Sequence, residues 1–243
     1  MENGISVSSD DYKFFVGLYN DDEKLVRESG VLVDPYWIMT SRHMLEYNKP
    51  DEILRIAVDP YEGQALTKFR SFHNIEKIVE CDEFTINTPN PVVVMPDIVL
   101  VKSQSRLDTE GASPIPFWPL YVPEDSKVTV VGLGSDLQLP RLKMGIYHES
   151  HETVFESHVK NPVNQDFSSN QCAISPTETG GPIIIFDGYE KRLAGIISTS
   201  IGGYPGESQI TGVGLFRPEV IIWIENTIGR PITKHPQLSE MHR

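Results

Sequence analysis

The chain has 243 residues, of which 39% are hydrophobic and 23% charged, a composition that suits a folded protein with a well-buried core. No run of 18 apolar residues occurs, so no transmembrane helix is predicted. The formal net charge of −13 argues against binding to nucleic acid or to an anionic membrane, and either keeps the protein soluble or offers an acidic face to a basic partner.

Short runs of strand-forming residues alternate with turn residues along most of the chain and predict an all-β sandwich or barrel. The expected strands are Phe14–Tyr19, Gly30–Val33, Trp37–Thr40, Ile53–Val58, Asp97–Val101, Val128–Gly132, Gly181–Phe186, Leu193–Ser198 and Gly212–Phe216. Four prolines lie close together between the two halves of this series, as is typical of a linker. They are Pro114, Pro116, Pro119 and Pro123.

A helix is predicted over residues 218–228, near the end of the chain. Pro218 and Glu219 suit a first helical turn, and Gly229 suits a helix end. The apolar residues of this segment share one face and are expected to pack on a barrel. They are Val220, Trp223, Ile224 and Ile228. The polar segment 229–243 is predicted to be a flexible tail.

Three motifs contain the residue types needed for nucleophilic catalysis. They are Thr40-Ser41-Arg42-His43, Pro96-Asp97-Ile98-Val99-Leu100 and Glu178-Thr179-Gly180-Gly181-Pro182. A histidine can take the proton of a hydroxyl group, while a buried aspartate fixes the tautomer of the ring and stabilises the imidazolium.

These motifs resemble the histidine, aspartate and nucleophile motifs of the trypsin/chymotrypsin family of serine proteases. Gly30–His43 is similar to G-S-L-I…W-V-L-T-A-A-H, Asp97–Lys102 to D-I-A-L-L-K, Thr179–Pro182 to S-G-G-P, Gly195–Ser198 to G-I-V-S, and Trp223-Ile224 to the W-I of the terminal helix. Five matches in order imply the family's fold, two six-stranded antiparallel β-barrels and a C-terminal helix. The domain would cover residues 1–228, with barrels at about 12–117 and 124–217.

The resemblance places His43, Asp97 and Thr179 at the three positions of the catalytic triad, with threonine where the family has serine. A threonine hydroxyl is able to attack a carbonyl group. Its additional methyl group must nevertheless fit into a tight turn, and a misplacement of the attacking atom by ~1 Å can cost about 10²-fold in rate.

The site that would bind the oxyanion is altered as well. The resemblance assigns this role to the backbone N–H groups of Thr177 and Thr179, and Thr177 replaces a glycine whose conformation threonine resists. Glu178 replaces an aspartate that pairs in the family with a newly cleaved N-terminus Ile-Val-Gly-Gly. Because Met1–Gly4 occupies the matching place, no activation by cleavage is expected.

The substrate cleft also departs from the family pattern. Ser198-Thr199-Ser200 stands in place of S-W-G, and the segment that begins at Gly212 stands in place of G-V-Y. The loss of the tryptophan removes an apolar wall beside a bound peptide. No acidic residue matches the base of the specificity pocket, so no preference for arginine or lysine is implied.

Two cysteines, Cys81 and Cys172, occur in the sequence. The family's disulfide beside the histidine would need cysteines at Glu28 and Met44, and both are absent. Cys172 matches a paired cysteine of the family but has no candidate partner in the loop before it, and Cys81 is expected in the other barrel, too far away to bridge. Both thiols are therefore expected to be free and buried, with a redox switch as the alternative. So few cysteines, and no basic or apolar signal at the N-terminus, favour an intracellular (cytoplasmic) protein. A secreted chain from which a signal peptide was removed is the alternative.

The sequence therefore predicts a serine protease homologue without catalytic activity, a pseudoprotease that binds a protein or peptide partner. The alternatives are an active endopeptidase, in which Thr179 attacks, His43 acts as base and Asp97 orients it, and a structural or storage role. No cofactor and no metal are expected, although a surface cation site is conceivable among His148, Glu149, His151, Glu152 and His158.

Overall fold

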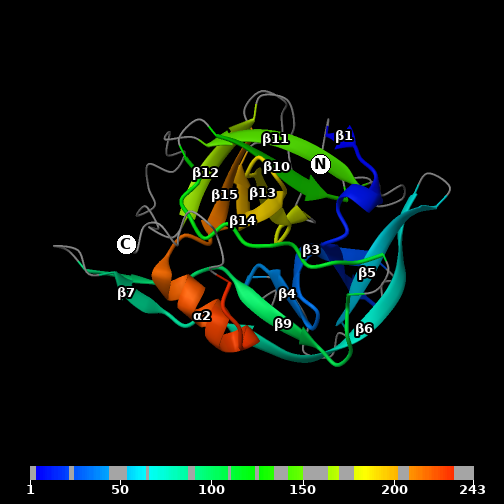
Figure 1. Ribbon diagram of the computed structural model, residues 1–243, viewed down its shortest axis with the longest axis horizontal. Coiled ribbons are helices and arrows are strands. Elements are labelled where there is room, and N and C mark those ends of the chain that lie inside the picture. Colours follow the sequence, from blue (N-terminus) through cyan, green and yellow to red (C-terminus); the bar gives the residue numbers. More distant parts are fainter. Residues whose placement is uncertain are drawn as a thin grey trace.

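The computed structural model describes residues 4–21, 25–43, 54–63, 66–86, 91–108, 111–123, 126–133, 142–149, 164–169, 178–201 and 208–232. Antiparallel strands make up most of these residues, and all but two of the strands belong to two sheets that lie against each other (Figure 1). A short 3₁₀ turn, η1 (Ser9–Asp11), lies near the N-terminus, and helix α2 (Pro218–Ile228) follows the last strand.

The first sheet is a closed barrel of six strands. Their order around the barrel is β2 (Phe15–Asn20), β3 (Leu25–Asp34), β4 (Trp37–Thr40), β9 (Val99–Ser103), β6 (Leu66–Glu80) and β5 (Leu54–Gly63). A separate hairpin, formed by β7 (Phe84–Ile86) and β8 (Val92–Val94), lies between β6 and β9 in the chain.

The second sheet also returns on itself. It contains β10 (Lys127–Gly132), β11 (Lys143–Glu149), β12 (Asn164–Ser169), β13 (Pro182–Phe186), β14 (Lys191–Ile201) and β15 (Ser208–Gly214). The strand order β11-β10-β13-β14-β15-β12 is completed by a pairing of β11 with β12, and β1 (Ile5–Ser6) is added at β11. Two six-stranded antiparallel barrels with a C-terminal helix, the expected fold, are thus confirmed.

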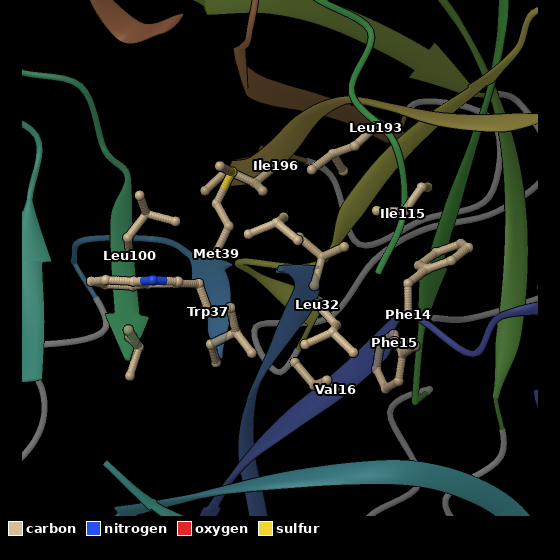
Figure 2. Packing of buried hydrophobic residues seen from close by; sticks show 14 of the residues in the cluster. Phe14, Phe15, Val16, Leu32, Trp37, Met39, Leu100, Ile115, Leu193 and Ile196 are labelled. Carbon is tan, nitrogen blue, oxygen red and sulfur yellow. The ribbon is translucent and has the colours of Figure 1, made fainter. Parts of the chain in front are cut away.

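The core is continuous between the two barrels. Met39 and Leu32 of the first barrel belong to the same buried cluster as Leu193 and Ile196 of the second (Figure 2). All four residues of β4 are buried, because one face of this strand points into its own barrel and the other is covered. Full burial of an aliphatic side chain contributes about 1.5–3 kcal/mol, so this shared cluster stabilises the packing of one barrel on the other.

The proline-rich segment between the barrels is hydrogen-bonded to both of them. The Ile115 N–H donates to Leu32 O (3.0 Å) in β3, and the Trp118 N–H donates to Leu193 O (2.7 Å) in β14. Prolines lack a backbone donor, but their carbonyl groups still accept, as Pro116 O does from the Leu193 N–H (2.8 Å). The predicted linker is therefore part of the packed structure.

Helix α2 presents the predicted face to the protein. Val220 and Ile224 are buried, and Trp223 and Ile228 pack against the core with part of their surface. The helix ends at Gly229, whose φ of 74° is left-handed. Beyond the helix, Arg230 Nε donates to Asp34 Oδ2 (2.7 Å); residues 233–243 of the expected tail lie outside the described residues.

Several strands were absent from the sequence expectation, notably β6, β11 and β12. β6 is 15 residues long, but most of its side chains are polar or charged and half exposed or exposed, so its apolar alternation is weak. None of the helices in the described part of the chain has the length and apolar character needed to cross a bilayer.

Candidate active site

His43 and Asp97 meet at one end of the first barrel. His43 lies three residues after the end of β4, Asp97 lies two residues before β9, and these strands are paired, with Thr40 opposite Val99. The His43 N–H donates to Asp97 Oδ1 (2.8 Å), and His43 Nδ1 lies 2.6 Å from Asp97 Oδ2. Both carboxylate oxygens thus fix the orientation of the ring, and Nε2 is the nitrogen that can exchange a proton with a hydroxyl group.

The second barrel contributes a further hydrogen-bond donor to Asp97. Ser198 Oγ donates to Asp97 Oδ2 at 2.6 Å. In β14, Ile197 pairs with Gly212 and Thr199 with Thr211, so Ser198 is the additional residue of a β-bulge. A bulge changes the direction of a side chain, and here it directs Ser198 towards the other barrel.

Hydrogen bonds determine the charge state of Asp97. Burial alone would raise the pKa of this carboxyl group. The hydrogen bonds from the His43 ring, the Ser198 hydroxyl and the His43 backbone outweigh this effect and hold the pKa of Asp97 below its usual value. The group is therefore a carboxylate at neutral pH, as an orienting residue needs to be.

Thr179 lies in a turn that is packed against the same end of the first barrel. The Ser29 N–H donates to Thr179 O (3.2 Å), and the Gly180 N–H donates to Ile197 O (2.8 Å). Gly180 has a φ of 77°, and a Cβ at this position would overlap Thr40 Oγ1 and lie 2.5 Å from Ser29 O. Only glycine permits so close an approach. The turn thus contacts the loop that leads to His43.

A family model described as Trypsin matches residues 3–217. The chain belongs to the trypsin family. Its two barrels, its paired His43 and Asp97 and the turn at Thr179 make it serine protease-like in layout.

Glu28 also belongs to this site. The sequence drew attention to its position only because a disulfide cysteine of the trypsin family is absent there. Ser41 Oγ donates to Glu28 Oε2 at 3.4 Å. Burial raises the pKa of Glu28 to about 8; His43 and the bond from Ser41 lower it, whereas Asp97 raises it. A carboxyl group that is largely neutral at pH 7 therefore lies beside the histidine–aspartate pair.

Glu178 is fully buried beside the turn. Its aliphatic part packs over Gly132, where a Cβ would overlap Glu178 Cγ. Glu178 thus fills space between the turn and β10.

The structure describes only some of the remaining residues that the sequence singled out. Gly212 is buried in β15, where a Cβ would overlap the Ile183 side chain, and Thr199 is exposed. Ser200 pairs with Ile210, but its side chain lies outside the described residues, as do all of Thr177 and Cys172.

The conceivable cation site is not described either. The side chains of His148 and Glu149 lie outside the described residues, and so do all of His151, Glu152 and His158. Among the residues that the structure does describe, no three histidine, cysteine, aspartate or glutamate side chains converge in a way that could hold a metal ion.

Proposed function

We propose that this protein is a catalytically silent member of the trypsin family, which binds a protein or peptide partner. The observation that carries this proposal is the position of Thr179 in a turn that is fixed on two sides. The Ser29 N–H donates to the Thr179 carbonyl oxygen, and the Gly180 N–H donates to Ile197 O. On the side of Thr40, the turn has no room even for a Cβ at Gly180.

A fixed turn leaves little freedom for the additional methyl group. Thr179 is 8% exposed, so its side chain is almost surrounded. Threonine has few favourable χ1 rotamers, so its methyl and hydroxyl groups have little choice of direction in this turn. Near-attack geometry tolerates little displacement, and we expect a loss of at least about 10²-fold relative to serine in the same turn.

The alternative, an active endopeptidase, is favoured by one specific observation. Asp97 Oδ2 lies 2.6 Å from both His43 Nδ1 and Ser198 Oγ. These distances are those expected where an aspartate orients a catalytic histidine. In that case Thr179 Oγ1 would attack the substrate carbonyl carbon and His43 Nε2 would accept the hydroxyl proton. The peptide C–N bond would then break, with His43 giving the proton to the leaving amine, and the acyl group would remain on Thr179 as an acyl-enzyme.

A fluorophosphonate probe separates the two functions. In an active site the hydroxyl oxygen bonds to phosphorus, fluoride leaves and His43 accepts the proton. We expect no labelling of the wild-type protein above the level of Thr179→Ala, and no burst of product from an activated ester. Labelling that is abolished in both Thr179→Ala and His43→Ala would instead establish the endopeptidase.

The variant Thr179→Ser tests the rest of the site. We expect it to stay nearly inactive, because Thr177 and Glu178 also replace the family's residues around the oxyanion position. Rapid labelling of Thr179→Ser would mean that the methyl group alone silences the protein.

A further inference from the structure

The surface between α2 and the chain that leaves β6 contains a groove of about 470 Å³. It is lined on one side by the end of β6 and the start of β7, and on the other by α2. Figure 1 shows β7 and α2 as neighbours on one side of the molecule. The groove is separate from the candidate active site: His43, Asp97, Thr179 and Ser198 are not among its lining residues.

The floor of this α2 groove is apolar. Val79, Phe84 and Trp223 line it while another part of each side chain packs against the core. Ile222 is 56% exposed, although Val220 and Ile224 beside it are buried. A single exposed isoleucine is ordinary, but one that shares a concave surface with Trp223 and Phe84 forms a place where an apolar side chain can be buried.

The rim of the α2 groove is acidic. Four exposed carboxylates line it, and neither a lysine, an arginine nor a histidine is among its lining residues. They are Glu80, Asp82, Glu83 and Glu219. Within the described residues, no ion pair joins any of these carboxylates to a cationic side chain. Their negative potential is therefore available to a partner.

The apolar surface continues beyond the groove along the hairpin of β7 and β8. Phe84, which lines the groove, pairs with Val94, and the neighbouring Val93 and Met95 are 64% and 45% exposed. A small cation would use the carboxylates but not these apolar side chains, and an acidic ligand would be repelled. The combination suits a polypeptide whose lysine or arginine side chains flank an apolar anchor.

We propose that the α2 groove is a docking site for a basic polypeptide segment with an apolar anchor residue. The apolar side chain lies between Phe84, Ile222 and Trp223, and the flanking cations meet the carboxylates of Glu83 and Glu219 on opposite sides. This inference rests on the proposed binding role of the protein and assigns the partner's chemistry to one surface.

A fluorescein-labelled peptide, Lys-Leu-Lys-Phe-Lys-Leu-Lys, tests the α2 groove by fluorescence anisotropy. We expect saturable binding to the wild-type protein that weakens as salt is added, because rim charges are screened. The variant Glu83→Lys/Glu219→Lys is expected to weaken binding by at least about tenfold, and Ile222→Ser by several-fold. A second peptide, in which serine replaces leucine and phenylalanine, should bind more weakly than the first.

The matched control is Asp10→Lys/Asp11→Lys, which changes the net charge by the same amount in the exposed turn η1. We expect its affinity for the peptide to equal that of the wild type. Equal weakening in both double variants, or equal binding of the serine peptide, would reduce the interaction to general charge attraction and overturn the proposal.

Hydrogen exchange of the wild-type protein gives a result that does not depend on the folding of any variant. Saturating peptide should protect amides of residues 79–84 and 219–227, and protection elsewhere only would overturn the assignment. Fluorophosphonate labelling of Thr179 would refute the silent active site and leave the groove standing. Failure of the peptide to bind would remove the groove and leave the silent site standing.

Discussion

Ser198 and Asp97 come from different barrels, and a hydrogen bond of 2.6 Å joins them. Asp97 also accepts a hydrogen bond from the backbone N–H of His43, and its Oδ2 lies 2.6 Å from Nδ1 of the His43 ring. The geometry of the histidine–aspartate pair therefore depends on how the second barrel is seated against the first. Three such partners stabilise this partly buried carboxylate, because each of them offsets part of its desolvation.

The variant Ser198→Ala should destabilise the protein by about 1–3 kcal/mol, because it removes a hydrogen bond to a partly buried carboxylate. The pKa of Asp97 should rise in the same variant, since one of the bonds that lower it is lost. Urea denaturation measures the first effect and NMR titration of the carboxyl group the second. The exposed neighbour provides the control, Thr199→Ala, which should change neither quantity. An unchanged denaturation midpoint in Ser198→Ala would contradict the inter-barrel role.

Gly180→Ala should be strongly destabilising, by more than about 3 kcal/mol. The left-handed backbone costs roughly 1–2 kcal/mol for any residue with a Cβ, and overlap with Thr40 Oγ1 and contact with Ser29 O add to that cost. Gly229→Ala is the matched control, because its φ of 74° is nearly the same but a Cβ there meets no atom within 4 Å. Its loss should stay near 1 kcal/mol in thermal unfolding. Similar losses in the two variants would mean that the turn is not tightly packed against β3 and β4.

The parts of the site that could be placed together from the sequence are those fixed by local patterns. His43 follows an apolar strand, Asp97 precedes another, and the pairing of these strands brings the two residues together. Ser198 was expected only in the substrate cleft, because its bond to Asp97 depends on a β-bulge and on inter-barrel packing, and neither has a signature in the local sequence.

Glu28 illustrates a second limit of prediction. In the sequence it is a glutamate in a mixed polar segment, and only the absence of a cysteine at that position marked it. Its burial, its bond with Ser41 and its proximity to His43 arise from barrel closure. β6 was not predicted for a related reason. Its side chains are mostly polar, so the sequence lacks the apolar alternation of a strand, although β6 pairs with β5 and β9 and closes the barrel.

The contribution of Glu28 to the stability of the protein should fall as the pH rises from about 4.5 to about 8. Its pKa is 4.5 ordinarily and about 8 in the folded protein, so in this range the folded state binds more protons than the unfolded state. The stabilisation is complete below pH 4.5 and is lost as the pH passes 8. The full difference in pKa sets a limit of roughly 5 kcal/mol, and we expect about 2 kcal/mol because part of the side chain remains in contact with solvent.

Glu28→Gln isolates this contribution, since glutamine keeps the acceptor for Ser41 and does not ionise. Urea unfolding at several pH values should show the variant gaining stability relative to the wild type as the pH rises from about 4.5 to about 8, with no further gain above that range. Glu219→Gln, at an exposed carboxylate, is the control for the loss of one negative charge. If the difference between Glu28→Gln and the wild type does not change with pH, the glutamate ionises normally in the folded protein.

Cys81 should be unreactive towards thiol reagents as long as the protein is folded. The residue is 1% exposed, and burial, with a smaller contribution from Asp82, raises the pKa of its thiol to about 12. The nucleophilic thiolate is therefore scarce at neutral pH, and reagent has no access to it. In the variant Cys172→Ser, a chromogenic disulfide reagent should find no reactive thiol until urea unfolds the chain, at which point one should appear. Because the reaction would then follow unfolding, its rate should rise with the destabilising variant Gly180→Ala. Rapid labelling in the native state would instead support the redox switch.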